Sequence, residues 1–356
     1  MNKLRWGFLS AANIGRKNWE AIYDSGNAVV AAVASRDVKR SRKFIKECQA
    51  QAKFETSPEA VGSYEELINS KDIDAVYIPL PTGLRKEWIL RAARAGKHVL
   101  CEKPCGVSSA DLRQMIEACR RNRVQFMDGV MFMHNPRMDR IRKVLDDCRS
   151  VGQVKRICSN FSFHMDEDSF DTNIRINSRL EPSGCLGDLG WYCIRFALWT
   201  MNWRLPREVT ACILSQRNAG RGFASVPTDF SAELFFDGGV SAAFYCSFIA
   251  EHQNWVHVSG TKGQLRMQDF VHPLSDHEPA FELNGREVRV KCCNCRGKHS
   301  QSREIAQKTN MIRNFSRQAR SGKLNQDWPM WALKTQQVMD ACLAATGTRG
   351  VKTLKR

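Results

Sequence analysis

The stretch GFLSAANIG, residues 7–15, decides the fold of the first part of the chain. An apolar run leads into it and a helix-like stretch follows it, which is typical of the G-x-G-x-x-G turn of dinucleotide-binding proteins. Ser10 and Ala12 occupy the first two glycine positions, and only Gly15 matches. Ala12 adds one methyl group where a backbone must approach a pyrophosphate, and Gly15 lets the helix lie close to the strand. We therefore expect the turn still to bind a nucleotide, with an ordinary strand-to-helix turn as the alternative.

Short apolar runs recur throughout the first 130 residues, and polar or amphipathic stretches of helical length separate them. This alternation predicts a parallel, doubly wound sheet of the Rossmann type. The expected strands are Leu4–Leu9, Ala28–Ala34, Ala75–Ile78, His98–Cys101 and Val124–Met127.

From about residue 150 the pattern changes to longer strands with alternating polarity. Two of them meet at Asp237-Gly238-Gly239, a sequence that favours a hairpin. The expected fold class is therefore α/β plus α+β, a Rossmann domain followed by a mostly antiparallel sheet. The expected domains are a dinucleotide-binding domain over residues 1–130, a substrate and oligomerisation domain over residues 131–325, and a C-terminal segment over residues 326–356 that packs back on the Rossmann domain.

Composition narrows the function classes. The 356 residues are 43% hydrophobic and 26% charged, as in a globular protein of two packed domains. Apolar runs are too short to cross a membrane, and the N-terminus turns polar too soon for a signal peptide, so we expect no membrane partner. The formal charge is +17, but Lys and Arg are dispersed among Asp and Glu. We interpret this as a solvated surface that favours anionic ligands, with no nucleic-acid partner.

The 14 cysteines bear on location and on metal binding. Many lie in apolar runs, where a reduced thiol packs as a small hydrophobe, so we expect a cytoplasmic protein. Cys292, Cys293, Cys295 and His299 are four soft ligands within one short segment. Their spacing differs from the usual C-x-x-C knuckle, so we favour a basic loop without metal over a zinc site.

Three further motifs accompany the first one. They are VLCEKP at 99–104, GCLGDLGWY at 184–192 and VSGTKGQLR at 258–266. Together the four motifs resemble the glucose-fructose oxidoreductase / inositol dehydrogenase family over nearly the whole chain. The resemblance implies a Rossmann domain joined to a substrate domain on a large open sheet, and a homo-oligomer, dimer or tetramer. It also implies an NAD(P)-dependent oxidoreductase that transfers hydride between nicotinamide and a sugar, polyol or related vicinal hydroxy compound.

Glu102-Lys103-Pro104 follows the apolar run 98–101, so it lies at the carboxyl edge of the sheet, where ligands bind in open α/β folds. The resemblance implies that Lys103 lies beside the nicotinamide and the reacting carbon, and that a cis peptide precedes the proline. A lysine there can exchange a proton with a hydroxyl as hydride moves. A surface turn is the alternative.

Asp188 and Tyr192 are four residues apart, so on a helix they share one face and can address one substrate. Many relatives carry a histidine at the second position. Tyr192 replaces it, as in members that resemble glucose-fructose oxidoreductase, dihydrodiol dehydrogenase and NADP-dependent xylose dehydrogenase. A tyrosine hydroxyl beside a cation such as Lys103 can polarise a carbonyl or relay a proton. Capping of the helix is the alternative role for Asp188.

The second apolar run ends in Ser35-Arg36-Asp37. Arg36, with Lys39 or Arg40, can pair with a 2′-phosphate, while Asp37 is well placed to cap the next helix. We therefore expect NADP, with NAD as the alternative. The expected cofactor-binding residues are Ser10, Ala12, Asn13, Ile14, Ser35, Arg36, Arg40, Pro79, Leu80, Pro81, Thr82, Glu102 and Lys103.

One position departs from the family pattern. The stretch PTGLRKEW keeps Pro81 and Thr82 but places Arg85 where relatives carry a histidine, which leaves the contacts at that position open. A non-catalytic, nucleotide-sensing regulatory protein on the same fold is the alternative function, because fold alone does not imply chemistry. Retention of Lys103 and Asp188 favours the enzyme.

Overall fold

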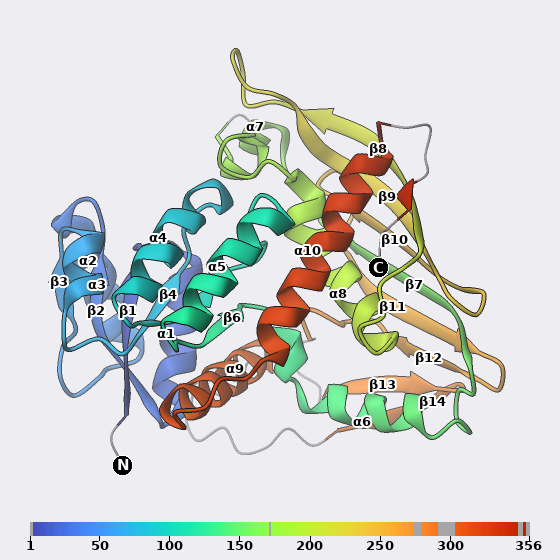
Figure 1. Ribbon diagram of the computed structural model, residues 1–356, viewed down its shortest axis with the longest axis horizontal. Helices are drawn as coiled ribbons and strands as arrows, with labels where there is room; N and C mark the ends of the chain where they lie inside the picture. Colours follow the sequence, from blue (N-terminus) through green and yellow to red (C-terminus); the bar gives the residue numbers. More distant parts are fainter. Residues whose placement is uncertain (1–2, 171, 274–278, 291–302, 348–351, 354–356) are drawn as a thin grey trace. The chain divides into compact units, whose positions relative to one another are not determined.

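The computed structural model describes residues 3–170, 172–273, 279–290, 303–347 and 352–353 (Figure 1). These residues belong to two compact units, and each contains one sheet. The expected fold class, a parallel Rossmann sheet plus a mostly antiparallel one, is confirmed. The first unit comprises Met1–Cys105, Ala110–Asn135 and Cys292–Met330, and the second comprises Gly106–Ser109, Pro136–Lys291 and Trp331–Arg356.

The described residues of the first unit form a six-stranded sheet in the order β3-β2-β1-β4-β5-β6, with all pairs parallel. Continuous apolar runs form its central strands because helices cover both faces. The final run pairs later than expected, at Phe126–Asp128, because the backbone of Val124 still bonds to the end of the preceding helix. The strands are β1 (Leu4–Leu9), β2 (Ala28–Ala34), β3 (Glu59–Val61), β4 (Ala75–Ile78), β5 (His98–Cys101) and β6 (Phe126–Asp128).

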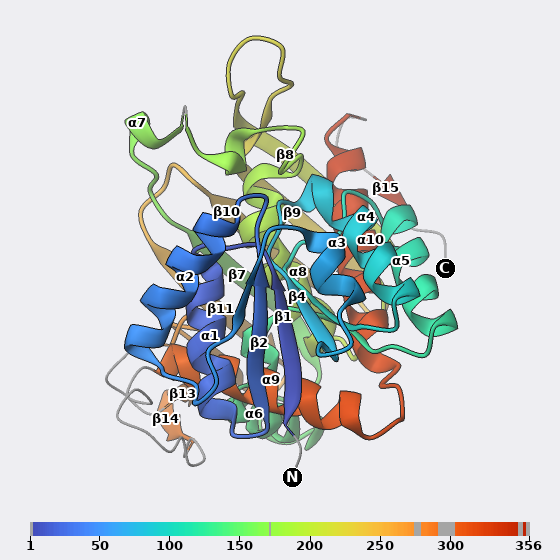
Figure 2. The same cartoon turned by 90° about the vertical axis from the view of Figure 1, so that its left-hand side faces the viewer.

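Helices lie on both faces of this sheet, as Figure 2 shows. One face carries α1 (Ile14–Ser25) and α2 (Val38–Gln51), and the other carries α3 (Tyr64–Asn69), α4 (Thr82–Arg94) and α5 (Ser109–Arg121). This arrangement follows from right-handed crossovers that run first toward β3 and then toward β6. The carboxyl ends of the strands therefore meet at one edge, where β1, β2, β4 and β5 each lead into a helix or turn.

Helix α9 (Arg303–Arg320) also belongs to the first unit, although residues 131–325 were expected to form the substrate domain. It packs against α1 and the sheet, where the rings of Trp6 and Phe315 lie 5.0 Å apart. The Asn27 side chain donates to the Arg313 carbonyl at 3.0 Å. An amphipathic helix covers whichever apolar surface is open, and the surface beside α1 is one.

The C-terminal residues also differ from expectation. From Trp331 onward, helix α10 (Asp327–Ala345) belongs to the second unit, and β15 (Lys352–Thr353) pairs with β8 (Glu208–Arg217) of the second sheet. Lys334 Nζ donates to the Trp203 carbonyl at 2.6 Å within that unit. The segment 326–356 is therefore divided. Its residues up to Met330 belong to the first unit, where the Trp328 ring stacks on Phe315 at 6.3 Å, and Lys352–Thr353 extend the large sheet by backbone pairing.

The second sheet has nine strands among the described residues, in the order β14-β13-β12-β11-β7-β10-β9-β8-β15. Its pairs are antiparallel except that β7 and β10 run parallel. The predicted hairpin joins β9 and β10, with positive φ at Gly238 and Gly239. The strands are β7 (Val154–Ser162), β8 (Glu208–Arg217), β9 (Val226–Phe236), β10 (Val240–Ser247), β11 (Gln253–Gly260), β12 (Gln264–Met267), β13 (Ala280–Leu283) and β14 (Arg286–Arg289).

Residues alternate between buried and partly exposed along β9 and β10, so one face of the sheet is covered. Helix α8 (Trp191–Thr200), every residue of which is buried, contributes to that cover. No helix of the described residues is both long and apolar enough to span a bilayer. The other helical segments are η1 (Met131–His134), α6 (Pro136–Asp146), α7 (Glu167–Phe170), η2 (Ile174–Ile176), η3 (Leu186–Gly190) and α8 (Trp191–Thr200).

Candidate active site

The turn between β1 and α1 keeps the geometry of a glycine turn with fewer glycines. Ser10 has φ of 144°, a region that glycine prefers. The amide of Gly15 donates to the Ala12 carbonyl at 2.9 Å, which closes the turn. A Cβ at Gly15 would lie 3.1 Å from the Phe44 ring, so glycine permits the close approach of α1. The turn thus places the N-terminus of α1 at the carboxyl edge of the sheet, where a pyrophosphate binds in this type of fold.

At the end of β2, one carboxylate caps the next helix, whereas two nearby cations are exposed. The Asp37 carboxylate accepts from the Lys39 amide at 2.9 Å, so the predicted cap of α2 is confirmed. Arg36 and Arg40 are exposed, whereas Ser35 is buried. This donor set fits a 2′-phosphate better than an unmodified ribose, because the carboxylate is already bound to the helix.

A chain of buried hydrogen bonds leads from α1 to Glu102. The Asn18 amide donates to the Tyr77 hydroxyl at 2.8 Å, and that hydroxyl donates to Glu102 Oε1 at 2.7 Å. Complete burial raises the pKa of Tyr77 well above its usual range, so the hydroxyl remains a donor at every working pH. Sequence reasoning missed Asn18 and Tyr77. The signal that could have identified them is a polar residue where an apolar one is expected. Tyr77 lies within an apolar strand, and Asn18 lies on the buried face of a helix.

Lys103 follows Glu102, and the Lys103–Pro104 peptide is cis, as the resemblance implied. Gly129 lies against Glu102, because a Cβ there would be 3.2 Å from either carboxylate oxygen. The end of β6 thereby leaves room for that side chain. Glu102 and Lys103 thereby bring an acid group and a cation to the carboxyl end of β5, the edge at which ligands bind in this fold.

Arg85, the departure from the family pattern, points into the protein. The residue is 5% exposed, and its Nε donates to the Leu80 carbonyl at 2.6 Å. Its Nη1 donates to the Thr82 hydroxyl at 3.1 Å and to the Pro104 carbonyl. The guanidinium therefore contacts the segments after β4 and after β5.

The second unit brings Asp188 and Tyr192 together with a residue that sequence reasoning missed. Arg175 Nε donates to Asp188 Oδ2 at 2.6 Å. The Asp188 charge raises the pKa of Arg175, burial opposes it, and Tyr192 adds a smaller increase. Asp188 lies inside the π-helical segment η3, and α8 begins after Gly190, so the alternative of a cap at the start of α8 does not apply. The ion pair with Arg175 holds the Asp188 carboxylate in place.

The glycines of GCLGDLGWY allow this segment to approach the sheet. Gly184 has φ of 48°, and a Cβ there would overlap the carbonyl oxygen of Pro227 on β9. A Cβ at Gly190 would lie 3.2 Å from the Cys246 sulfur on β10. The motif is thus partly a packing requirement that holds Asp188 and Tyr192 in place.

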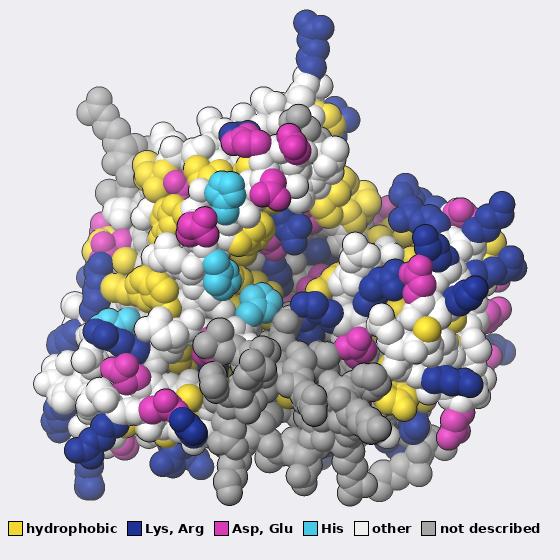
Figure 3. All heavy atoms as spheres, turned by 180° about the vertical axis from the view of Figure 1, so that it is seen from behind, with side chains coloured by type: hydrophobic (Ala, Val, Ile, Leu, Met, Phe, Trp, Pro, Cys, Tyr) yellow, Lys and Arg dark blue, Asp and Glu magenta, His cyan; other side chains and the backbone are white. Residues whose placement is uncertain are grey.

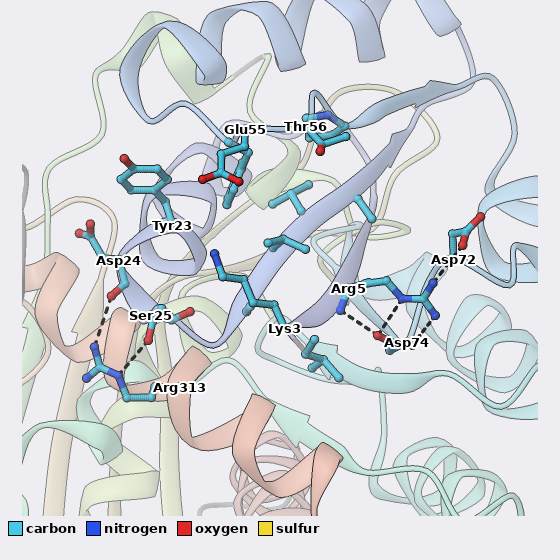
Figure 4. Close-up of a pocket in the computed structure, with 18 of the residues that line it drawn as sticks. Lys3, Arg5, Tyr23, Asp24, Ser25, Glu55, Thr56, Asp72, Asp74 and Arg313 are labelled. Carbon is cyan, nitrogen blue, oxygen red and sulfur yellow. Dashed lines mark hydrogen bonds and ion pairs between the residues drawn. The ribbon is translucent and has the colours of Figure 1, made fainter. Parts of the chain in front are cut away.

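A hollow of about 1540 Å³ opens at the opposite, amino-terminal edge of the first sheet (Figure 4). Two of the arginines that line it have partners within the protein. Arg5 binds Asp74 at 2.8 Å and Asp72 at 3.0 Å, while Arg313 donates to backbone carbonyls before β2. The strands β1, β2, β4 and β5 begin at this hollow, so it is distinct from the expected cofactor edge.

Charge and metal ligands give no second candidate in the described part of the chain. Figure 3 shows Lys and Arg side chains interspersed with Asp and Glu on one face. Within the described residues, His, Cys, Asp and Glu form no group of three that could hold a metal ion. The predicted metal-free segment Cys292–His299 lies outside the described residues.

Comparison with known proteins places the chain. Residues 4–130 match the family described as "Oxidoreductase family, NAD-binding Rossmann fold", and residues 138–266 match "GFO/IDH/MocA C-terminal domain". The altered glycine turn, the lysine turn and the second sheet together define an oxidoreductase that binds a nicotinamide dinucleotide. The chain belongs to the GFO/IDH/MocA oxidoreductase family.

Individual relatives agree with this assignment. The chain is 31% identical over 287 residues to D-xylose 1-dehydrogenase (NADP(+)) 2 of Haloferax volcanii, covering 80% of this chain and 82% of that one. It is 31% identical over 269 residues to trans-1,2-dihydrobenzene-1,2-diol dehydrogenase of Bos taurus, covering 75% and 74%. A 3-ketoreductase from Actinomadura kijaniata, solved with NADP and TDP-benzene, superposes with a TM-score of 0.80 at 25% identity, covering 96% and 98%. These relatives are dehydrogenases and reductases, and no finding favours the nucleotide-sensing regulator.

Proposed function

We propose that the protein is an NADP(H)-dependent oxidoreductase that transfers hydride to or from a CH–OH carbon of a sugar, polyol or related vicinal hydroxy compound. The observation that carries the proposal is the Glu102-Lys103-Pro104 turn at the carboxyl edge of β5 in a chain of this family. The similar proteins that act on xylose and on a dihydrodiol support the substrate class. The bound nicotinamide supplies or accepts the hydride.

In this proposal each site residue has one role. Lys103 takes the hydroxyl proton during oxidation and returns it during reduction, because its ammonium can donate and its free amine can accept. Tyr192 assists that transfer through its hydroxyl. Asp188, held by Arg175, accepts a hydrogen bond from a second substrate hydroxyl and so orients the reacting carbon.

We propose the following contacts for the cofactor. The turn residues Ser10, Ala12, Asn13 and Ile14 bind the pyrophosphate through backbone amides. Ser35, Arg36 and Arg40 bind the 2′-phosphate. Pro79, Leu80, Pro81, Thr82, Glu102 and Lys103 line the nicotinamide half.

The Lys103 role is tested by Lys103→Met with a panel of sugars and diols, following nicotinamide absorbance. Loss of the proton-transfer group should lower kcat by about two to four orders of magnitude. NADPH affinity, measured by fluorescence titration, should change little. Lys71→Met, an exposed change before β4, is the matched control and should keep parental turnover. Near-parental turnover of Lys103→Met would show that another group moves the proton.

Cofactor preference is tested by titration with NADPH and NADH. We expect NADPH to bind more tightly, and Arg36→Ala to remove most of the difference because a phosphate dianion loses its guanidinium partner. Arg42→Ala changes another exposed arginine, on α2, and should leave the preference intact. Equal or tighter NADH binding by the parent protein would mean that Asp37 reads the ribose.

We also propose a homo-oligomer, dimer or tetramer, in the cytoplasm. The family resemblance supports self-association, and the free thiols of the described cysteines, many of them buried, support a reducing compartment. Light scattering during size-exclusion chromatography tests the first point. A monomeric mass at micromolar concentration would contradict it.

A further inference from the structure

Arg85 holds two backbone carbonyls that belong to different turns. Leu80 lies in the turn after β4, and Pro104 lies in the turn after β5. Nε of Arg85 donates to the first carbonyl at 2.6 Å, and Nη1 donates to the second. Because β4 and β5 are adjacent parallel strands, one planar side chain spans the gap between their carboxyl ends.

The hydroxyl of Thr82 adds to the same link. It accepts from Arg85 Nη1 at 3.1 Å and lies 3.4 Å from the Pro104 carbonyl oxygen, to which it donates. Thr82 and Arg85 are 3% and 5% exposed, so water does not compete for these bonds. A guanidinium presents its donors in a rigid fork, whereas a lysine offers one compact point charge.

Burying a cation costs free energy unless hydrogen bonds compensate for the lost water. A buried guanidinium that donates to backbone oxygens therefore fixes the positions of those oxygens relative to one another. The two turns it joins are the nicotinamide lip, residues 79–82, and the Lys103–Pro104 turn of the proposed mechanism. We propose that Arg85 is a positioning residue, which sets the distance between bound nicotinamide and the Lys103 amine. This inference rests on the proposed function.

The test removes the guanidinium group of Arg85 by mutation and then supplies guanidinium ion in solution. Arg85→Ala leaves a cavity lined by the two carbonyls, which guanidinium ion fits. We expect kcat to fall about 10- to 100-fold, because a displacement near 1 Å at the reacting groups has that effect, with KM for the substrate little changed. We expect NADPH to bind about three- to tenfold more weakly, because residues 79–82 are no longer held in one position by Arg85. Guanidinium at tens of millimolar should restore part of the kcat and part of the NADPH affinity, and sodium chloride at equal ionic strength should restore neither.

Two further variants complete the design. Arg85→Lys keeps the charge and one donor, so it should fold and give a kcat between those of the parent and Arg85→Ala. Arg91→Ala removes a guanidinium from the same helix that pairs with Glu65 and Glu87 at the surface, and should match the parent in both readouts.

The outcomes separate positioning from simple stability. If guanidinium restores the melting temperature of Arg85→Ala but neither its kcat nor its NADPH affinity, Arg85 is only structural and the inference is wrong. If Arg85→Ala does not fold, Arg85→Lys decides: a kcat lowered at least about fivefold at constant KM supports positioning, and a parental kcat refutes it. If the parent oxidises no sugar or diol, the proposed function fails, while guanidinium-dependent NADPH binding still decides whether Arg85 holds the lip.

Discussion

Tyr77→Phe is the sharpest test of the buried network beneath Glu102. The change removes one oxygen from a side chain with no measurable exposure and keeps the ring, which packs edge-on against Phe8 at 5.1 Å. Glu102 loses the donor at 2.7 Å, and the Asn18 amide loses its acceptor at 2.8 Å. The void left is smaller than a methyl group, so packing contributes little.

The magnitude follows from these two bonds. A hydrogen bond to a charged group is worth about 1.5–3 kcal/mol, and a buried donor left without its acceptor costs about 1–3 kcal/mol. The second cost is reduced because Asn18 Nδ2 also donates, at 3.4 Å, to the Ile14 carbonyl. We therefore expect Tyr77→Phe to lower the free energy of unfolding by about 2–4 kcal/mol.

Urea unfolding followed by tryptophan fluorescence measures this difference. Tyr64→Phe is the matched control, because that ring packs edge-on against Trp88 at 4.9 Å and is partly exposed. It should stay within about 0.5 kcal/mol of the parent. A Tyr77→Phe midpoint equal to that of Tyr64→Phe would refute the claim that the hydroxyl joins α1 to Glu102.

Two further predictions concern stability. In thermal melts, Gly184→Ala should lower the free energy of unfolding by more than about 3 kcal/mol, because φ is positive there and the new Cβ would overlap the Pro227 carbonyl. Gly238→Ala, also at a positive φ but with open space around it, should lower it by about 1–2 kcal/mol. Burial raises the pKa of Asp74, but the Arg5 hydrogen bonds outweigh it and lower that pKa overall, so this stabilisation is complete above the ordinary carboxyl range and is lost as pH falls through the lowered pKa. The stability difference between the parent and Arg5→Gln should therefore shrink in acid, and a difference that is constant down to about pH 2 would contradict this.

The strands of the first sheet were predictable where burial on both faces makes a run continuously apolar, as in β1, β2, β4 and β5. The strand β3 was not, because its three residues, Glu59–Val61, carry an exposed charge and are too short to show a period. The placement of α9 was also missed. An amphipathic pattern shows that a helix covers something, but the surface it covers depends on which one the rest of the chain leaves open.

The candidate site divides in the same way. Lys103 and Asp188 stood out because they lie in compact motifs. Tyr77 and Arg175 did not, since their partners Glu102 and Asp188 lie 25 and 13 residues away, and a side-chain hydrogen bond at that separation leaves no local period. The role of Arg85 as an internal link likewise depends on two turns that only the folded sheet brings together.

The discontinuous make-up of the first unit has a consequence for biosynthesis. Residues up to Asn135 emerge from the ribosome long before α9, which packs its Phe315 ring on Trp6. The second sheet cannot form early either, because its first strand, β7, pairs with β10 and β11, which are synthesised later; Arg156 of β7 lies opposite Ser241 of β10. Neither unit can close while the chain is half made, so nascent chains must keep both apolar surfaces from aggregating until translation nears its end.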